Sequence, residues 1–334
     1  MTEREIPYNY TSADDRRILA WLLGPGVLPP LDRLVFTRRT GRSWRLLMRF
    51  AGDLFIHRRN PFLYQELLDD RERRRRFLEA ARRDLSLITE RGAGSSDLAL
   101  VLERCREALG GLEVELSAVR HRRQRIRRRL GAVVGEQNVH FDPFTLMAHA
   151  TDATNWRLHL PTAVVRPREE WEVPLLLEAV ADLGLKLIPR GGGTGLTGGA
   201  VPAAPDCVVI NTEKLDRIGA IQEETFAGPD GGPLTLSTIS LGAGVITEAA
   251  MAAAADAGWV FATDPTSAWA CTVGGNIAEN AGGKRAVLWG TAIDNLLRFR
   301  MAVPGGRLVE VRRSQPTGRR IGAEETIAFD VADP

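Results

Sequence analysis

In the first 135 residues, apolar positions recur at the three- and four-residue spacing of amphipathic helices. One helix is predicted to begin near Ser12, a second to cover residues 61–88 and a third residues 96–130, with a candidate break at Gly110-Gly111. Two shorter apolar segments leave the choice between strand and helix open: residues 34–37 and 44–50. The pattern therefore predicts a mainly helical N-terminal region.

After residue 135 the apolar runs become shorter and are bounded by glycine or proline, as is typical of buried strands. Strands are predicted at residues 163–165, 185–189, 207–211, 235–243 and 307–312. A helix is predicted at residues 169–183, ended by Gly184, and an alanine-rich helix at residues 244–257, with Thr247 as its N-cap and Gly258 at its end. The order of strand, helix and strand predicts an α+β or α/β unit.

The most informative segment follows the strand at residues 185–189 and has the sequence Pro189-Arg-Gly-Gly-Gly-Thr-Gly-Leu-Thr-Gly-Gly199. Glycines at this density allow positive φ and let a ligand approach the main chain closely. Successive backbone amides can then converge on one anion, as in the nests that bind phosphate. The segment therefore predicts a cradle for a phosphate or pyrophosphate, although a glycine-rich surface loop without a ligand would have the same composition.

The same segment contains the pattern G-x-G-x-x-G at residues 193–198, which also occurs in dinucleotide-binding Rossmann units. A Rossmann unit requires a helix that opens at the last glycine, and here Gly199 and Pro202 follow at once. A Walker A loop is excluded as well, because the Gly283-Lys284 pair lacks a glycine five residues before Gly283. The order of strand, glycine loop and strand fits neither motif.

A second segment of small residues covers residues 261–283, where Gly274-Gly275 and Gly282-Gly283 flank Asn276 and Asn280. Small side chains let the backbone approach a flat ligand, and the asparagines offer neutral hydrogen bonds. Together the two segments predict a large ligand with a phosphate centre and a planar end. A flavin dinucleotide fits that description better than a free phosphate.

The distribution of charge divides the chain where the hydrophobic pattern changes. Residues 1–135 contain 28 arginines and 18 acidic residues, a net charge of +10, whereas residues 136–334 contain 16 basic and 24 acidic residues, a net charge of −8. A chain of 334 residues has room for two domains. We therefore expect an arginine-rich, mainly helical N-terminal region at residues 1–135 and a second domain at residues 136–334.

Two runs of arginine lie on the predicted helices, at residues 71–76 and 120–129. Such runs bind nucleic acid, anionic lipid or an acidic partner protein, or they form a solvated helix face. No aromatic residues are interleaved for stacking on bases, so no nucleic-acid partner is predicted. The alternative to a solvated face is that these basic helices dock to a partner protein or peripherally to a membrane.

Composition narrows the class of protein. With 44% apolar and 26% charged residues, the chain resembles soluble globular proteins. The longest apolar stretch, residues 245–262, is interrupted by two acidic residues, and the N-terminus lacks the basic and apolar run of a secretory signal. Cys105, Cys207 and Cys271 are far apart, which predicts neither a disulfide scaffold nor a metal site. A cytoplasmic location is expected.

The two glycine-rich segments together resemble a known family. Three stretches are similar to the FAD-binding domain of the vanillyl-alcohol-oxidase type (PCMH-type). They are the first segment, Asp264-Pro-Thr-Ser and Cys271-Thr-Val-Gly-Gly-Asn-Ile-Ala-Glu-Asn-Ala-Gly-Gly283. The nearest branch is that of the D-lactate, glycolate and D-2-hydroxyglutarate dehydrogenases. The resemblance covers residues 150–313 and implies an α+β fold with two α+β subdomains. The N-terminal region is similar to an extension of very large bacterial FAD and iron–sulfur oxidoreductases.

The resemblance assigns residues to the cofactor. The first segment would hold the FAD pyrophosphate through Pro189, Arg190, Gly191, Gly192, Gly193, Thr194, Gly195, Leu196, Thr197, Gly198 and Gly199. The second would lie along the isoalloxazine and ribityl groups, with Pro265, Ala270, Cys271, Thr272, Gly274 and Gly275, and with Asn276, Asn280, Ala281 and Gly282 close by.

The mode of attachment follows from the same resemblance. Thr194 occupies a position where members with covalent flavin often carry histidine, so FAD is expected to be non-covalent. Cys271 is expected to be a packing residue. His140, His149 and His159 are expected to be structural or surface residues.

The activity that the resemblance implies is oxidation of a D-2-hydroxy acid such as D-lactate or glycolate. Hydride would pass from Cα to flavin N5, and electrons would leave through a quinone, a cytochrome or an iron–sulfur protein. The reaction also needs a base for the hydroxyl proton and a cation for the carboxylate, and no catalytic residue is assigned. In this family both come mostly from a later capping domain. We therefore expect the chain to be a fragment, with any iron–sulfur cluster only in a downstream part.

Two alternatives remain open. One keeps the fold but changes the substrate to another alcohol or a sugar, and the run at residues 277–283 favours the hydroxy-acid branch over it. The other makes the chain a non-catalytic docking module, in which basic helices bind partners and the flavin site is vestigial. Flavin occupancy separates the second alternative from the enzymatic interpretations.

Overall fold

The computed structural model describes residues 12–37, 42–91, 95–228, 232–314, 321–322 and 325–334. The chain forms two compact units, Met1–Gln124 and Arg125–Pro334. The division lies within helix α6 (Ser96–Val134), whose C-terminal part belongs to the second unit. The domain limits 1–135 and 136–334 stay a prediction.

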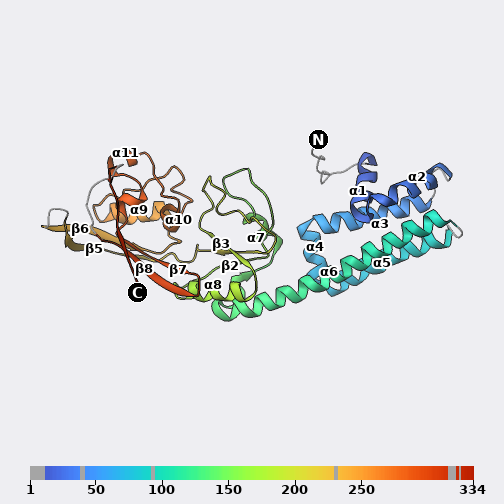
Figure 1. Cartoon of the computed structure of the whole chain (residues 1–334), viewed down its shortest axis with the longest axis horizontal. Coiled ribbons are helices and arrows are strands. Elements are labelled where there is room, and N and C mark those ends of the chain that lie inside the picture. The colour runs from blue at the N-terminus through green and yellow to red at the C-terminus, as the bar shows by residue number, and fades with distance from the viewer. Residues whose placement is uncertain (1–11, 38–41, 92–94, 229–231, 315–320, 323–324) are drawn as a thin grey trace. The chain divides into compact units, whose positions relative to one another are not determined.

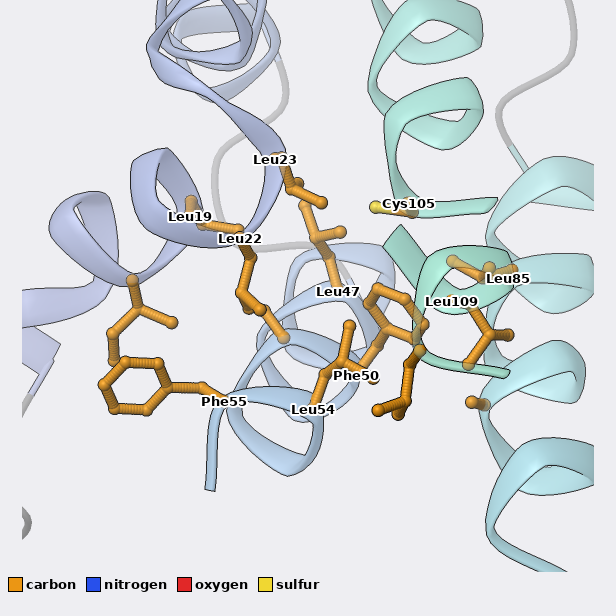
Figure 2. Packing of buried hydrophobic residues seen from close by; sticks show 14 of the residues in the cluster. Leu19, Leu22, Leu23, Leu47, Phe50, Leu54, Phe55, Leu85, Cys105 and Leu109 are labelled. Atoms are coloured by element: carbon orange, nitrogen blue, oxygen red, sulfur yellow. The ribbon is translucent and has the colours of Figure 1, made fainter. Parts of the chain in front are cut away.

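The first unit is built from helices (Figure 1). They are α1 (Asp15–Leu23), α2 (Leu28–Thr37), α3 (Arg42–Arg59), α4 (Pro61–Asp69), α5 (Arg71–Arg91) and the N-terminal part of α6, with the 3-10 helices η1 (Ser12–Asp14) and η2 (Pro25–Val27). The apolar sides of these helices meet in one core. Figure 2 shows Leu22, Leu54 and Leu109 in this core, together with Cys105, whose burial raises the pKa of its thiol to about 12.

Residues 61–88 form parts of two helices rather than one, so the prediction of a single helix is wrong. The backbone of Asp70 is extended, with φ −95° and ψ 107°. Its carboxylate accepts hydrogen bonds from the amides of Glu72, at 2.8 Å, and Arg73, at 3.0 Å. Because an Asp side chain satisfies the amides that a new helix leaves unpaired, Asp70 starts α5 within a continuous apolar periodicity. Conversely, α6 runs through the candidate break at Gly110-Gly111.

The second unit contains a four-stranded sheet in the order β1-β2-β4-β3. Its strands are β1 (Val139–His140), β2 (Ala163–Val165), β3 (Lys186–Arg190) and β4 (Cys207–Asn211). Strands β2, β4 and β3 are parallel, and β1 is antiparallel to β2. The strand predictions at residues 163–165 and 207–211 are confirmed.

Helices cover both faces of this sheet, which explains why β2 and β4 are buried along their length. Residues Ile126 and Leu130 of α6 and Leu176 of α8 (Glu172–Asp182) form one apolar cluster with alternate residues of β2 and β4. On the opposite face, Val164 and Val209 pack against Leu146 of α7 (Pro143–Ala148). Helix α8 also provides the crossover that parallel β2 and β3 require.

The rest of the second unit adds two antiparallel sheets. One pairs β5 (Ile218–Ala227) with β6 (Pro233–Leu241), and the other contains β7 (Arg298–Val303), β8 (Arg307–Arg313) and β9 (Phe329–Ala332). The remaining elements are η3 (Glu136–Asn138), α9 (Thr247–Asp256), α10 (Val273–Ala278), α11 (Ala286–Trp289) and η4 (Ala292–Asn295). The molecule has the predicted α+β fold with a mainly helical N-terminal region.

The predicted N-cap of the alanine-rich helix is wrong. Ile246 precedes α9, and no side chain caps its first turn. Thr247 lies inside the helix and is fully buried, with its hydroxyl oxygen 2.5 Å from Asn276 Nδ2 and 3.3 Å from the Cys271 carbonyl. The Thr247 hydroxyl therefore bonds to residues far away in the sequence and not to the first amides of its own helix, as the predicted cap would require. Within the described ranges, no helix combines the length and apolar character needed to cross a bilayer.

Candidate functional site

The glycine-rich loop of residues 191–199 leaves the carboxyl end of β3. Arg190 is paired with Asn211 of β4, and the Thr212 amide donates a hydrogen bond to the Arg190 carbonyl at 2.9 Å. Ligands of open sheets bind at the carboxyl ends of parallel strands. The chain reaches β4 without opening a helix at Gly198, so the predicted order of strand, loop and strand is confirmed.

The backbone amides of this loop find no acceptor among the described residues. In the described part of the chain, no amide of residues 191–199 donates a hydrogen bond to another protein group. Positive φ at Gly193, 66°, and at Gly198, 78°, turns the peptide planes within the loop. Free N–H groups in a loop of this kind can converge on an anion.

The start of the loop is pressed against the second glycine-rich segment. A Cβ built on Gly191 would lie 2.1 Å from Thr272 Oγ1, and one on Gly192 would lie 2.0 Å from the Ala270 carbonyl oxygen. Neither position has room for a side chain. By contrast, a Cβ on Gly195 would meet nothing within 4 Å, so the middle of the loop is open. The fold therefore brings the two segments together.

The second segment is hydrogen-bonded to neighbouring backbone and within itself. The amides of Val273 and Gly274 each donate at 2.9 Å to backbone carbonyls, those of Val245 and Ala243. The Gly275 amide donates to Thr272 Oγ1 at 3.3 Å. Glycine serves here for close packing, since a Cβ on Gly274 would lie 2.8 Å from Ala243. The part of this segment around Val273 to Gly275 therefore forms a wall in which the backbone donors are occupied by other protein groups.

Other predicted site residues hold this wall in shape. Cys271 is buried, and its Sγ lies 3.2 Å from Thr247 Oγ1. Asn280 has a positive φ of 49°, and its Oδ1 accepts from the Ile293 amide at 3.0 Å. The Ala281 carbonyl accepts from the Ala292 amide at 2.9 Å. The side chain of Asn276 is directed to Thr247, as described above. Their cofactor contacts stay a prediction.

Arg190 fixes the base of the loop. Its guanidinium donates to the Thr151 carbonyl at 2.7 Å and to the carbonyls of Ala148 and Ala200 at 3.4 Å each. Burial lowers the pKa of Arg190, and the nearby Asp152 carboxylate opposes that shift. The side chain therefore joins the glycine loop to the segment that precedes β2.

The histidines contribute structure. His149 is buried, and its Nδ1 donates to the Thr145 carbonyl at 2.8 Å, so its Nε2 is free to accept from Asn211 Nδ2 at 2.8 Å. Burial lowers the pKa of His149, which favours this neutral form. Burial likewise lowers the pKa of the half-buried His140, whereas His159 is exposed.

Two residues at the far end of the loop were missed by the sequence analysis. The Thr197 hydroxyl donates to the Glu279 carboxylate, with oxygen distances of 3.2 and 3.1 Å. Trp156 contacts Gly198, because a Cβ on that glycine would lie 2.6 Å from the indole carbons Cε3 and Cζ3. Glu279 lies inside the second segment, so its position was visible in the sequence. Nothing local marks Trp156 as a neighbour of the loop.

Comparison with protein families gives two matches. Residues 161–312 match the family described as "FAD binding domain". Residues 1–114 match a family described as "Protein of unknown function (DUF3683)".

Curated relatives match the second part of the chain. Glycolate oxidase subunit GlcD of Bacillus subtilis is 28% identical over 206 residues, which is 62% of this chain and 40% of that protein. D-lactate dehydrogenase of Archaeoglobus fulgidus is 34% identical over 148 residues, 44% of this chain and 30% of that protein. The chain thus spans 30–40% of the length of these two relatives. Among solved structures, an alkyldihydroxyacetonephosphate synthase gives a TM-score of 0.47 at 20% identity, covering 56% of this chain and 34% of that one.

The residues present fit the cofactor that the family name specifies. The free amides of residues 191–199 suit a diphosphate, and the small side chains of the wall suit the close approach of a flat group. The loop has no side chain at the two positions where a Cβ would collide with that wall. The family match and this geometry agree on a site for FAD within residues 161–312.

Proposed function

We propose that this chain supplies the FAD site of an oxidoreductase that oxidises a D-2-hydroxy acid such as D-lactate or glycolate. The observation that carries the proposal is the row of unpaired amides over residues 191–199, backed by the wall at Ala270 to Thr272. The names of the relatives, glycolate oxidase and D-lactate dehydrogenase, support the substrate class.

Within this proposal the two segments have different tasks. The amides of the first segment bind the two phosphates, and Arg190 keeps that loop in place through the Thr151 carbonyl. The second segment, from Pro265 to Gly282, limits how deeply the ligand enters and presents small residues to its flat part. When bound, FAD supplies the acceptor for the hydride that leaves the substrate carbon.

We further propose that FAD is bound without a covalent link and that a separate acceptor, such as a quinone, a cytochrome or an iron–sulfur protein, removes the electrons. Thr194 offers no nucleophile of the kind that covalent flavins use. The Cys271 thiol is buried and directed to Thr247. These two observations support reversible binding.

The test is the visible absorption spectrum of the purified chain, before and after acid precipitation. A flavin spectrum that moves entirely into the acid supernatant, and that co-migrates with FAD on chromatography, is the expected result. A chain that is folded by circular dichroism and stays colourless after incubation with FAD would contradict the proposal for this chain. Anaerobic reduction of the flavin in the full-length protein by D-lactate, L-lactate, glycolate and simple alcohols then tests the substrate class.

A further inference from the structure

We propose that Trp156 is a stacking surface for one planar ring of the bound dinucleotide, which makes residues 151–156 a third wall of the site. The inference rests on the proposed function, since the ring belongs to the FAD that the two glycine-rich segments would bind. It adds a binding residue that lies outside both segments.

The first observation is the contact between Trp156 and Gly198. The indole carbons lie where a side chain of residue 198 would otherwise be, and the positive φ of 78° independently favours glycine there. The indole therefore lies directly on the backbone of the loop whose amides are unpaired. About half of its surface, 52%, is nevertheless exposed.

The second observation is that this segment is held in place at its start and ordered by hydrogen bonds within it. At its start, Arg190 donates to the Thr151 carbonyl at 2.7 Å. In its middle, Asp152 Oδ1 accepts from the amide of Thr154, at 2.8 Å, and from its hydroxyl, at 2.6 Å. The Trp156 amide in turn donates to Thr154 Oγ1 at 3.1 Å. A binding side chain on such a pre-ordered segment loses little conformational entropy when a ligand arrives.

The third observation concerns charge along the loop. Glu279 accepts from Thr197, and one of its carboxylate oxygens would be 3.3 Å from a Cβ on Gly199. A carboxylate at this end disfavours a phosphate group. The phosphates should therefore bind nearer to Gly193 and Gly195, which leaves an uncharged ring for the end where Trp156 lies.

An exposed indole beside an anion cradle suits a ligand with a charged centre and aromatic ends. Leu196, which is 78% exposed on the same loop, adds a second apolar group. Both the adenine and the isoalloxazine of FAD are planar rings joined to phosphate. Either ring offers the planar surface on which Trp156 would stack, and the ligand fragments FMN and ADP distinguish the two.

The experiment measures the dissociation constants of FAD, FMN and ADP for the apo form of the full chain. The variants are Trp156→Ala, Trp156→Phe and the control Trp259→Ala, which removes a tryptophan of similar exposure, 50%, beyond the end of α9. Loss of one base–aromatic stack typically weakens binding by about tenfold. Trp156→Ala should weaken FAD by about that factor and only one of FMN and ADP. Trp156→Phe should keep most of the affinity, and Trp259→Ala should match the parent chain.

The affected fragment identifies the ring: FMN for isoalloxazine, ADP for adenine. Unchanged FAD affinity in a folded Trp156→Ala chain would overturn the inference, as would an equal loss for all three ligands. If the alanine variant does not fold, the Phe variant still tests the proposal. In the Phe variant, the part of the tryptophan fluorescence that FAD quenches should decrease more than the part that FAD does not quench. A parent chain that binds no FAD would instead refute the proposed function, so the two failures are distinguishable.

Discussion

The two glycine-rich segments of the second unit have similar composition but differ in how their central amides are hydrogen-bonded. In the first, residues 191–199, the amides are unpaired in the described structure, and Gly195 faces open space. In the second, the amides of Val273 and Gly274 are bonded to the neighbouring backbone, and Thr272 is buried. Under the proposed function, the first segment would receive the ligand and the second would stand behind it.

This difference shows that glycine is used for two physical reasons in one site. In the first segment it permits positive φ and exposes N–H groups. At Gly274 and Gly283 it permits contact with another part of the backbone, since a Cβ on Gly283 would lie 2.0 Å from the Asp264 carbonyl oxygen. Substitutions should therefore impair ligand binding in the first segment and folding in the second.

The largest effect is expected where the two segments touch. In Gly192→Ala the new methyl group would meet the Ala270 carbonyl at 2.0 Å, and backbone cannot move aside as a flexible side chain can. Relieving this overpacking by shifting the loop away from its binding geometry costs about 1–3 kcal/mol, so FAD should bind about 5- to 150-fold more weakly. Gly111→Ala is the matched control and should retain affinity within about threefold, since Gly111 is exposed on α6, outside both glycine-rich segments, and nothing lies within 4 Å of its Cβ. Fluorescence titration with FAD measures both, and equal affinities would contradict the assignment of the contact.

A smaller effect, of another kind, is expected in the wall. Asn276→Ala removes a buried side chain that bonds to the buried Thr247 hydroxyl at 2.5 Å. Such a loss costs about 1–3 kcal/mol and should lower the melting temperature by several degrees. FAD affinity of the folded variant should change much less than in Gly192→Ala. Loss of FAD binding at an unchanged melting temperature would show instead that Asn276 contacts the cofactor directly.

The smallest effect is expected from the carboxylate that joins the two segments. Glu279→Gln keeps an acceptor for the Thr197 hydroxyl but removes a negative charge beside the phosphate cradle. Exposed charges act at about 0.2–1 kcal/mol, so FAD should bind about two- to fivefold more tightly at low salt, with less difference at high salt. Glu248→Gln, an exposed carboxylate on α9, is the control. Weaker binding by Glu279→Gln would mean that its charge orients the loop.

Local pattern predicted much of the fold. The strands at residues 163–165 and 207–211 and the helical N-terminal region follow from the apolar periodicity, which each segment contains within itself. Local signals were less reliable where short polar side chains had a choice of partner. Asp70 starts a new helix inside a continuous apolar pattern, and Thr247 bonds to Asn276 rather than capping its helix.

The sequence by itself determined that two glycine-rich segments exist, that they resemble a flavin-binding family and that no Rossmann helix follows the first of them. Tertiary structure decided which amides are free, that Gly192 lies against Ala270, and that Trp156 lies on Gly198. The physical reason is the distance along the chain over which each effect acts. Backbone propensity and periodicity act over a few residues, whereas a site is made by contacts between residues far apart in sequence, whose partners only the folded chain can select.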